Sequence, residues 1–134
     1  MTIKEIETLS GLPRANIRYY ESEGLITPRR AENGYRDYSQ ADADTLLRIK
    51  LLRALGLTIE QLKTLACGEA SLNAVLAERL QAMQQEQHAL GRAEQVAEQL
   101  RQAKGGYQTL DAERYLAELD AFCKEQKRVQ REKQ

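Results

Sequence analysis

Arg18-Tyr19-Tyr20-Glu21 decides the fold of this chain together with two segments that follow it, Gly24-Leu25-Ile26 and Asn33-Gly34-Tyr35-Arg36-Asp37-Tyr38. The first segment puts arginine and tyrosine on one expected helix, and the last puts an arginine beside a glycine turn. Arginine binds phosphates, tyrosine hydroxyl groups add neutral hydrogen bonds to the same backbone, and an Asn-Gly turn can push an arginine beyond the protein surface. The combination predicts a protein that grips a DNA duplex at two grooves.

Two short helices are expected in the first part of the chain. Thr2-Ile3-Lys4-Glu5 is a capping box and starts a helix over roughly residues 3–9. The second helix, Arg14 to Glu23, begins after Gly11-Leu12-Pro13, whose proline fixes a backbone angle suited to a helix start. Two short helices joined by a glycine turn make a helix-turn-helix. Its shared core is expected to contain Ile3, Ile6, Leu9, Leu12, Ile17 and Tyr20, with Arg14, Ala15, Arg18 and Tyr19 facing outward.

Residues 25–38 predict a wing, which is a small hairpin beside the helices. Leu25-Ile26 and residues 35–38 are each expected to extend as brief strands. Asn33-Gly34 between them is a strong signal for a tight hairpin turn. Tyr38, like Tyr20 on the second helix, is assigned to the core.

Two further helices follow the wing. Ser39-Gln40-Ala41-Asp42 resembles a capping box and opens a third helix that stops at Gly56, and Thr58-Ile59-Glu60-Gln61 starts a fourth that ends at Gly68. The third helix is expected to bury a broad face made of Ala43, Leu46, Leu47, Ile49, Leu51, Leu52 and Leu55.

A long helix is expected from Leu72 to Lys104, because this stretch has no proline and is rich in Ala, Leu, Gln, Glu and Arg. A helix longer than its own domain needs a partner, and a two-stranded coiled coil with a second copy is the simplest one. The alternative is a helix that folds back on its own domain. The seam of the coil is expected to contain Leu76, Leu80, Met83, Leu90, Ala97 and Leu100.

After Gly105-Gly106 the segment from Asp111 to about Arg128 is expected to be helical again. Its apolar stripe comprises Tyr115, Leu116, Leu119, Phe122 and Cys123, and packing onto the partner's long helix is the least demanding way to cover it. Tyr107, Tyr115 and Phe122 are candidates for an effector pocket that holds an aromatic or cationic compound. The plainer interpretation of these three rings is hydrophobic packing.

The composition fits one compact domain plus an extended element. The chain has 134 residues, 42% of them hydrophobic, and twenty basic residues balance twenty acidic ones. It therefore lacks the overall positive charge of many nucleic-acid binders. Between Arg14 and Arg36, however, five arginines face three glutamates, and the local field matters most when the contact surface is small.

No catalytic, cofactor or metal pattern stands out. The chain has one histidine, His88, and neither a glycine-rich phosphate loop nor a carboxylate cluster. Cys67 and Cys123 are far apart without ligand spacing, which favours two ordinary cysteines in a reducing cytoplasm over a metal or thiol sensor. No apolar run approaches the length of a membrane span. We expect no enzyme, no cofactor, no metal and no membrane segment.

The order of these parts, with Pro28 and Gly56-Leu57-Thr58-Ile59-Glu60-Gln61-Leu62 added to the three opening segments, closely resembles the MerR family of bacterial transcription regulators over residues 1 to about 104. The resemblance implies a mainly α fold. Its parts are a winged helix-turn-helix domain over 1–70, a dimerisation helix over 71–104 that forms an antiparallel coiled coil, and a C-terminal effector or packing segment with a short helix over 105–134. The charged end of that segment is compatible with a link to a further domain.

The resemblance also implies which residues bind DNA. It puts Arg14, Asn16, Arg18 and Tyr19 at the major groove and its phosphates, and Arg36, near Asn33 and Tyr35, at phosphate or the minor groove. A homodimer would bind a promoter palindrome with an overlong spacer and distort it for RNA polymerase, in response to an unidentified small-molecule effector. The chain departs from the family at Pro13, where a serine or threonine cap is usual. The alternative function is an architectural or interaction protein that bends DNA without sensing an effector.

Overall fold

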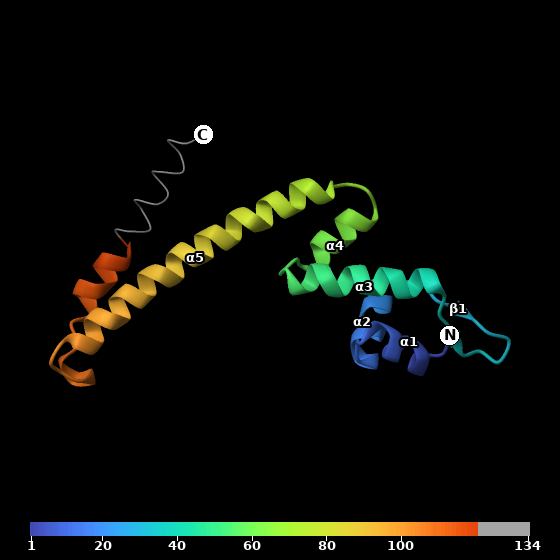
Figure 1. Ribbon diagram of the computed structural model, residues 1–134, viewed down its shortest axis with the longest axis horizontal. Helices are drawn as coiled ribbons and strands as arrows, with labels where there is room; N and C mark the ends of the chain where they lie inside the picture. Colours follow the sequence, from blue (N-terminus) through green and yellow to red (C-terminus); the bar gives the residue numbers. More distant parts are fainter. Residues whose placement is uncertain (121–134) are drawn as a thin grey trace. The chain divides into compact units, whose positions relative to one another are not determined.

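The computed structural model describes residues 1–120, and these fall into two compact units, one from Met1 to Arg79 and one that begins at Leu80. The first unit contains four helices, two short strands and the beginning of a long helix. In chain order these are α1 (Ile3–Ser10), α2 (Arg14–Ser22), β1 (Arg29–Arg30), β2 (Arg36–Asp37), α3 (Gln40–Ala54), α4 (Ile59–Ala66) and α5 (Leu72–Gln102). In Figure 1 α1 and α2 lie against α3, and the β1–β2 hairpin projects beside them.

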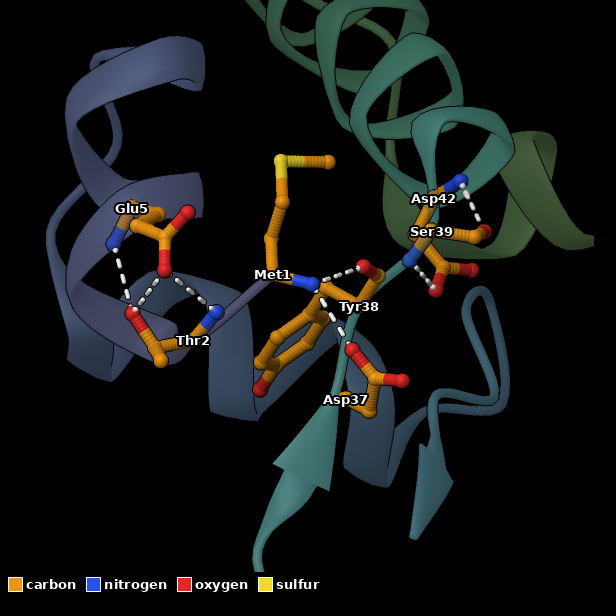
Figure 2. Close-up of polar contacts among 7 residues, drawn as sticks. All are labelled: Met1, Thr2, Glu5, Asp37, Tyr38, Ser39 and Asp42. Atoms are coloured by element: carbon orange, nitrogen blue, oxygen red, sulfur yellow. Dashed lines mark hydrogen bonds and ion pairs between the residues drawn. The ribbon is translucent and has the colours of Figure 1, made fainter. Parts of the chain in front are cut away.

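The predicted capping boxes start the helices where the sequence indicated. Thr2 Oγ1 accepts the backbone N–H of Glu5 at 3.2 Å, and a carboxylate oxygen of Glu5 accepts the N–H of Thr2 at 3.4 Å. Ser39 and Asp42 make the same reciprocal pair at the start of α3. Both boxes are drawn in Figure 2. Because each box satisfies two backbone donors that the helix itself leaves unpaired, the helix ends are fixed locally.

One apolar core holds the first unit together. Its buried members are Ile6, Leu12, Ile17, Tyr20, Ile26, Tyr38, Ala43, Leu46, Ile49 and Leu62. The assignment of Tyr20 and Tyr38 to the core is confirmed, since they are 6% and 1% exposed. The expectation that Leu9 belongs to it is wrong, because half of that side chain is exposed.

The broad buried face expected of α3 is narrower in the structure. Leu47, Leu51 and Leu55 are 44%, 61% and 37% exposed, so their predicted burial is wrong. The helix packs through Ala43, Leu46 and Ile49, which share one face at helical spacing, whereas the three leucines lie four residues apart on the next face. That second face stays accessible in the described part of the chain.

The wing exists, but its first strand lies later than expected. β1 is Arg29–Arg30, paired antiparallel to β2 with Arg30 opposite Arg36, whereas Ile26 is buried in the core. The Ala31 N–H donates to the Tyr35 carbonyl and the Gly34 N–H donates to the Ala31 carbonyl. Gly34 has a φ of 84°, a left-handed conformation that glycine adopts without strain. The loop is therefore the three-residue kind with a glycine bulge.

The second unit contains the rest of α5, a single turn of 3₁₀ helix, η1 (Tyr107–Thr109), and a helical stretch over 112–120. α5 ends two residues before the predicted Lys104. Asp111 Oδ1 accepts the Arg114 N–H at 3.3 Å, so the next helix starts where the sequence predicted. The predicted members Phe122 and Cys123 lie outside the described residues.

Residues 112–120 run back along their own α5, as Figure 1 shows. Arg92 donates from Nη1 to the Glu118 carbonyl at 3.2 Å, and Val96 on α5 is buried. The sequence-based expectation placed this stripe on the partner's long helix. In the single chain this stretch contacts its own α5, because the loop with Gly105-Gly106 is short enough to reverse the chain onto that helix. Packing onto the partner's helix stays a prediction. Leu116 remains 63% exposed. No helix in residues 1–120 is long and apolar enough to cross a membrane.

Candidate nucleic-acid interface

The turn between α1 and α2 is held by a lysine from α3. Gly11 has a φ of 72°, and its N–H donates to the Glu7 carbonyl at 2.9 Å. Lys50 Nζ donates to the Ser10 carbonyl at 3.1 Å, and a Cβ on Gly11 would lie 2.7 Å from that nitrogen. Glycine is favoured here by the backbone angle, whereas the lysine, as the end of a flexible side chain, could move away from a Cβ. The contact ties the end of α1 to α3.

The N-terminus of α2 is capped by a residue from α1. Pro13 is the N-cap and offers no side-chain hydrogen bond. Glu7 Oε2 instead accepts the Arg14 N–H at 2.9 Å and lies 3.4 Å from Arg14 Nε. A carboxylate at a helix N-terminus also interacts favourably with the helix dipole. Glu7 thus replaces the side-chain cap that Pro13 cannot supply, and it orients the Arg14 side chain.

The two faces of α2 separate as predicted. Ile17 is fully buried, whereas Asn16, Arg18 and Tyr19 are exposed, Tyr19 by 47%. Within residues 1–120, the side chains of Asn16 and Arg18 make no hydrogen bond or ion pair. A guanidinium and an amide held on a short rigid helix can pair with phosphates or base edges. This face is one half of the candidate interface.

An ion pair joins α2 to the wing. Arg36 Nε donates to both carboxylate oxygens of Glu21, at 2.7 and 3.0 Å, and both side chains are less than a third exposed. Partial burial strengthens such a pair relative to one in open solvent. The structure therefore gives Arg36, predicted as a DNA contact, a place at the junction of the helix and the hairpin.

The tip of the wing presents other groups outward. Tyr35 is 74% exposed, and Arg29 and Arg30 on β1 are exposed as well. Arg30 Nη1 donates to the Gly34 carbonyl at 3.0 Å, and Asn33 Oδ1 accepts the Tyr35 N–H at 3.1 Å. Asn33 thus shapes the turn through an Asx interaction, and its oxygen is occupied. The two β1 arginines make this hairpin basic.

The base of the wing is tied to the first residue. In Figure 2 the α-ammonium group of Met1 points between Asp37 and the Tyr38 carbonyl. It donates to Asp37 Oδ1 at 2.7 Å and to the Tyr38 carbonyl at 2.6 Å, while the Tyr38 N–H donates to the Met1 carbonyl at 2.8 Å. The hydrogen bond and the positive charge of the ammonium group lower the pKa of Asp37. Residue 1 therefore extends the pairing of β2.

Tyr38 anchors the same strand from the other side. Burial raises the pKa of its phenol, and the negative charge of Glu21 acts in the same direction. Its hydroxyl is buried without a hydrogen-bond partner in the described residues. The ring thus holds the wing to the core by packing rather than by polar contact.

A second ion pair fixes the other end of α2. Lys63 Nζ of α4 lies 2.6 Å from Glu23 Oε2, and the hydrogen bond to Glu23 raises the pKa of Lys63. Helix α2 is therefore clamped by Glu7 at its start, by Glu21 in its last turn and by Glu23 at its end. Sequence reasoning missed these three glutamates as positioning groups, because their partners are 7, 15 and 40 residues away.

The structure brings the predicted DNA-binding residues of α2 and of the wing into one unit. Arg29 and Arg30 were counted in the local charge but not among the site residues; their place on β1 adds them to the candidate set. The predicted seam residues Leu80 and Leu90 are 59% and 64% exposed in the single chain. Of the predicted effector residues, Tyr107 is 87% exposed, Tyr115 is half-buried, and Phe122 lies outside the described range.

Comparison with curated proteins gives partial matches. The chain is 46% identical over 65 residues to the HTH-type transcriptional regulator HmrR of Rhizobium leguminosarum bv. viciae, covering 48% of this chain and 50% of that protein. It is 44% identical over 66 residues to the heavy metal-dependent transcription regulator 2 of Rhizobium meliloti, covering 48% and 45%. The chain thus spans about half the length of the curated relatives it matches.

Solved structures match over a longer part of the chain. The transcription regulator PbrR691 of Ralstonia metallidurans in complex with lead(II) superposes with a TM-score of 0.68 at 26% identity, over 80% of this chain and 89% of that one. The N-terminal part of MtaN, the Bacillus subtilis multidrug transporter activator, gives 0.69 at 19% identity over 77% and 99%, a likeness of fold alone. The sequence model of a family described as "MerR HTH family regulatory protein" matches residues 1–68. The chain belongs to the MerR family of helix-turn-helix regulatory proteins, which are not enzymes.

Proposed function

We propose that this chain regulates transcription by binding a promoter palindrome as a homodimer and distorting it. α2 enters the major groove with Arg14, Asn16, Arg18 and Tyr19, and the wing lies on the adjacent backbone. Division into a DNA-binding part over 1–70, a dimerisation helix over 71–104 and an effector segment over 105–134 belongs to the same proposal.

The observation that carries the proposal is the rigid coupling of two exposed basic elements. Arg18 projects from a helix that is clamped at both ends, and the Glu21–Arg36 pair joins that helix to a hairpin with Arg29 and Arg30 on its surface. DNA-binding arginines are effective when their spacing is fixed before binding, because less conformational entropy is lost. In this arrangement Arg36 positions the wing, while the β1 arginines and Tyr35 meet the DNA.

The surface of α5 supports the proposal of a homodimer. Leu80 and Leu90 are largely exposed, and Met83 lies three residues after Leu80 and one heptad before Leu90. An apolar seam of this kind is stabilised by a second helix. A dimer also matches a palindromic site, because each half-site meets one copy.

Distortion of the promoter is energetically reasonable for such a dimer. Bending a site of 20–30 base pairs takes about 1–6 kcal/mol, which several added phosphate contacts offset. An effector that favours one of two DNA-bound states of similar energy then changes access for RNA polymerase without releasing the DNA. The effector segment is the part that follows α5.

The names of relatives suggest a metal effector. We therefore compare the side chains of this chain with the ligands that a metal site needs. Within residues 1–120 no group of three or more His, Cys, Asp or Glu side chains is arranged to hold a metal ion. The loop over 103–110 has neither a thiol nor an imidazole, and Cys67 is an exposed cysteine at the end of α4. The described residues therefore do not fit a thiolate metal site.

The test of the proposal is binding to a palindromic duplex from the region upstream of the coding sequence, compared with a scrambled duplex of the same composition. Fluorescence anisotropy over a salt titration gives the affinity and its salt slope, and light scattering gives the mass of the complex. We expect a dimer on the DNA, preference for the palindrome and a slope that corresponds to several phosphates. Equal binding to both duplexes would contradict the proposal.

A further inference from the structure

A cavity of about 430 Å³ lies in the second unit, after the last turn of α5. Its wall includes Leu100, Lys104, Tyr107, Leu110, Arg114 and Tyr115. All of these residues belong to the second unit, so the cavity does not depend on how the two units are placed.

The acceptor groups of this loop are used by the loop itself. Asp111 Oδ1 accepts the Arg114 N–H at 3.3 Å and caps the helical stretch over 112–120. Thr109 Oγ1 accepts the Gly106 N–H at 3.0 Å. A Cβ on Gly105 would lie 2.6 Å from that hydroxyl, so the loop needs glycine at this place. These contacts give the cavity a defined wall, and they use one oxygen of Asp111 and the hydroxyl oxygen of Thr109.

The two cationic side chains of the wall, Lys104 and Arg114, have weaker polar contacts than these acceptors. Lys104 makes no side-chain hydrogen bond or ion pair within residues 1–120. The Arg114 guanidinium lies 5.2 Å from the centre of the Tyr115 ring, and its Nε is 3.9 Å from a Glu118 oxygen, near the limit for an ion pair. The cavity wall thus carries two positive charges, Lys104 and Arg114, and one negative charge, Asp111, so its formal net charge is positive. The local field favours a negative ligand.

The remaining wall is apolar. Leu100 and Leu110 contribute aliphatic surface, and Tyr107 and Tyr115 contribute rings, of which Tyr107 is 87% exposed. Ligand sites typically combine such apolar walls with a small number of charged groups that fix orientation. The volume exceeds that of a single inorganic ion and accommodates a ring system.

We propose that this cavity binds a small organic carboxylate with an aromatic body, whose anionic end lies on Lys104 and Arg114 and whose rings lie against Tyr107 and Tyr115. If the proposed function holds, this carboxylate is the effector. The binding site itself rests only on the geometry of the second unit. The sequence predicts an aromatic or a cationic compound. We keep the aromatic ring and replace the cation by an anion, because the net charge of the cavity wall is positive.

The experiment uses the whole chain without DNA and three probes of one shape. Naphthoate carries a negative charge, naphthamide is its neutral counterpart, and naphthylmethylamine carries a positive charge. Binding is followed through the backbone amide NMR signals of Gly105 and Gly106. We expect naphthoate to shift both signals saturably, and the other two probes to bind at least tenfold more weakly, because they lack the charge-assisted contacts.

Two variants test the charged wall. Lys104→Gln and Arg114→Gln should each weaken naphthoate binding about tenfold and leave naphthamide binding unchanged. Arg101→Gln is the matched control: it removes the same charge from α5, but Arg101 pairs with Glu98 at 2.8 Å and does not line the cavity. Naphthoate binding should be retained in this control.

Several outcomes would overturn the inference. They are equal affinity for all three probes, tighter binding of the amine, no saturable shift with any probe, or a shift of the same amide signals by one equivalent of Zn²⁺ alone. Since DNA is absent from these measurements, naphthoate binding by a chain that fails to recognise the palindrome would keep the site and reject the regulatory function. The reverse result would reject the site alone.

Discussion

Arg36 Nε reaches both carboxylate oxygens of Glu21, at 2.7 and 3.0 Å, and this contact joins the last turn of α2 to the second strand of the wing. Two opposing effects on DNA binding follow from it. The Glu21 carboxylate repels phosphates, yet it holds the wing at a fixed angle to α2. Removing its charge separates the two effects, because repulsion and positioning predict opposite signs.

Glu21→Gln is expected to weaken DNA binding by about 1 kcal/mol, roughly fivefold, because a loosened wing outweighs the relief of repulsion. Glu32→Gln is the matched control, since Glu32 is an exposed carboxylate in the wing loop. It should strengthen binding slightly or leave it unchanged. Anisotropy titrations at one salt concentration measure both. Tighter binding by Glu21→Gln would show that the pair does not position the wing.

Arg18→Ala is expected to lower the salt slope of DNA binding by about one unit, because an exposed guanidinium on α2 that pairs with one phosphate releases about one counterion. Arg29→Ala should do the same if the first wing strand faces the backbone. Arg101→Ala, which removes one charge from α5, should leave the slope unchanged. A slope equal to wild type in the Arg18 variant would remove this residue from the phosphate contacts.

The helix boundaries and most of the core were predictable, because each depends on residues close together in the sequence. The capping boxes at Thr2 and Ser39 span four residues each, and the structure places both as expected. The wing was predicted from Asn33-Gly34, but its first strand was misplaced, because Ile26 has strand-forming chemistry and is used by the core instead. Local propensity cannot distinguish these two uses of a β-branched residue.

The clamps of the interface were not predictable, since each is a contact between distant segments. Nothing in the sequence distinguishes Glu7, Glu21 and Glu23 from other glutamates, and only the fold brings each to its partner. The exposed leucines of α3 show the same limit. Their spacing fits a helix face, but helical periodicity does not say how many faces the rest of the chain covers.

Asp37→Asn is expected to remove a pH-dependent contribution to stability. The ammonium group of Met1 lowers the pKa of Asp37 in the folded protein, so the carboxylate stabilises the fold above its ordinary pKa near 3.8. That contribution is lost as the pH falls through the lowered value. Urea midpoints of wild type and variant should therefore differ at neutral pH, begin to converge below about pH 3.8 and meet below the lowered pKa. A constant difference at all pH values would mean that the ion pair contributes nothing.

Gly56→Ala and Arg79→Ala are expected to be non-additive. Arg79 Nε donates to the Leu55 carbonyl at 2.8 Å, and a Cβ on Gly56 would lie 2.5 Å from its guanidinium. Gly56 also has a φ of 95°, so alanine is strained there by about 1–2 kcal/mol in any background. Removing the arginine relieves only the steric part. The double variant should thus lose less stability than the sum of the singles, measured by urea unfolding; strict additivity would place the guanidinium elsewhere.

Leu90→Glu is expected to yield monomers that bind DNA poorly, because it places a charge in the proposed seam of α5. Leu116→Glu makes the same change at a side chain that is equally exposed in the single chain, 63% against 64%, but belongs to the helical stretch over 112–120. Sedimentation velocity should show a monomer for the first variant and a dimer for the second. If the proposed dimer is required for palindrome binding, the affinity of the first variant should fall toward that for scrambled DNA. A stable dimer in Leu90→Glu would mean that the seam lies on another face of the helix.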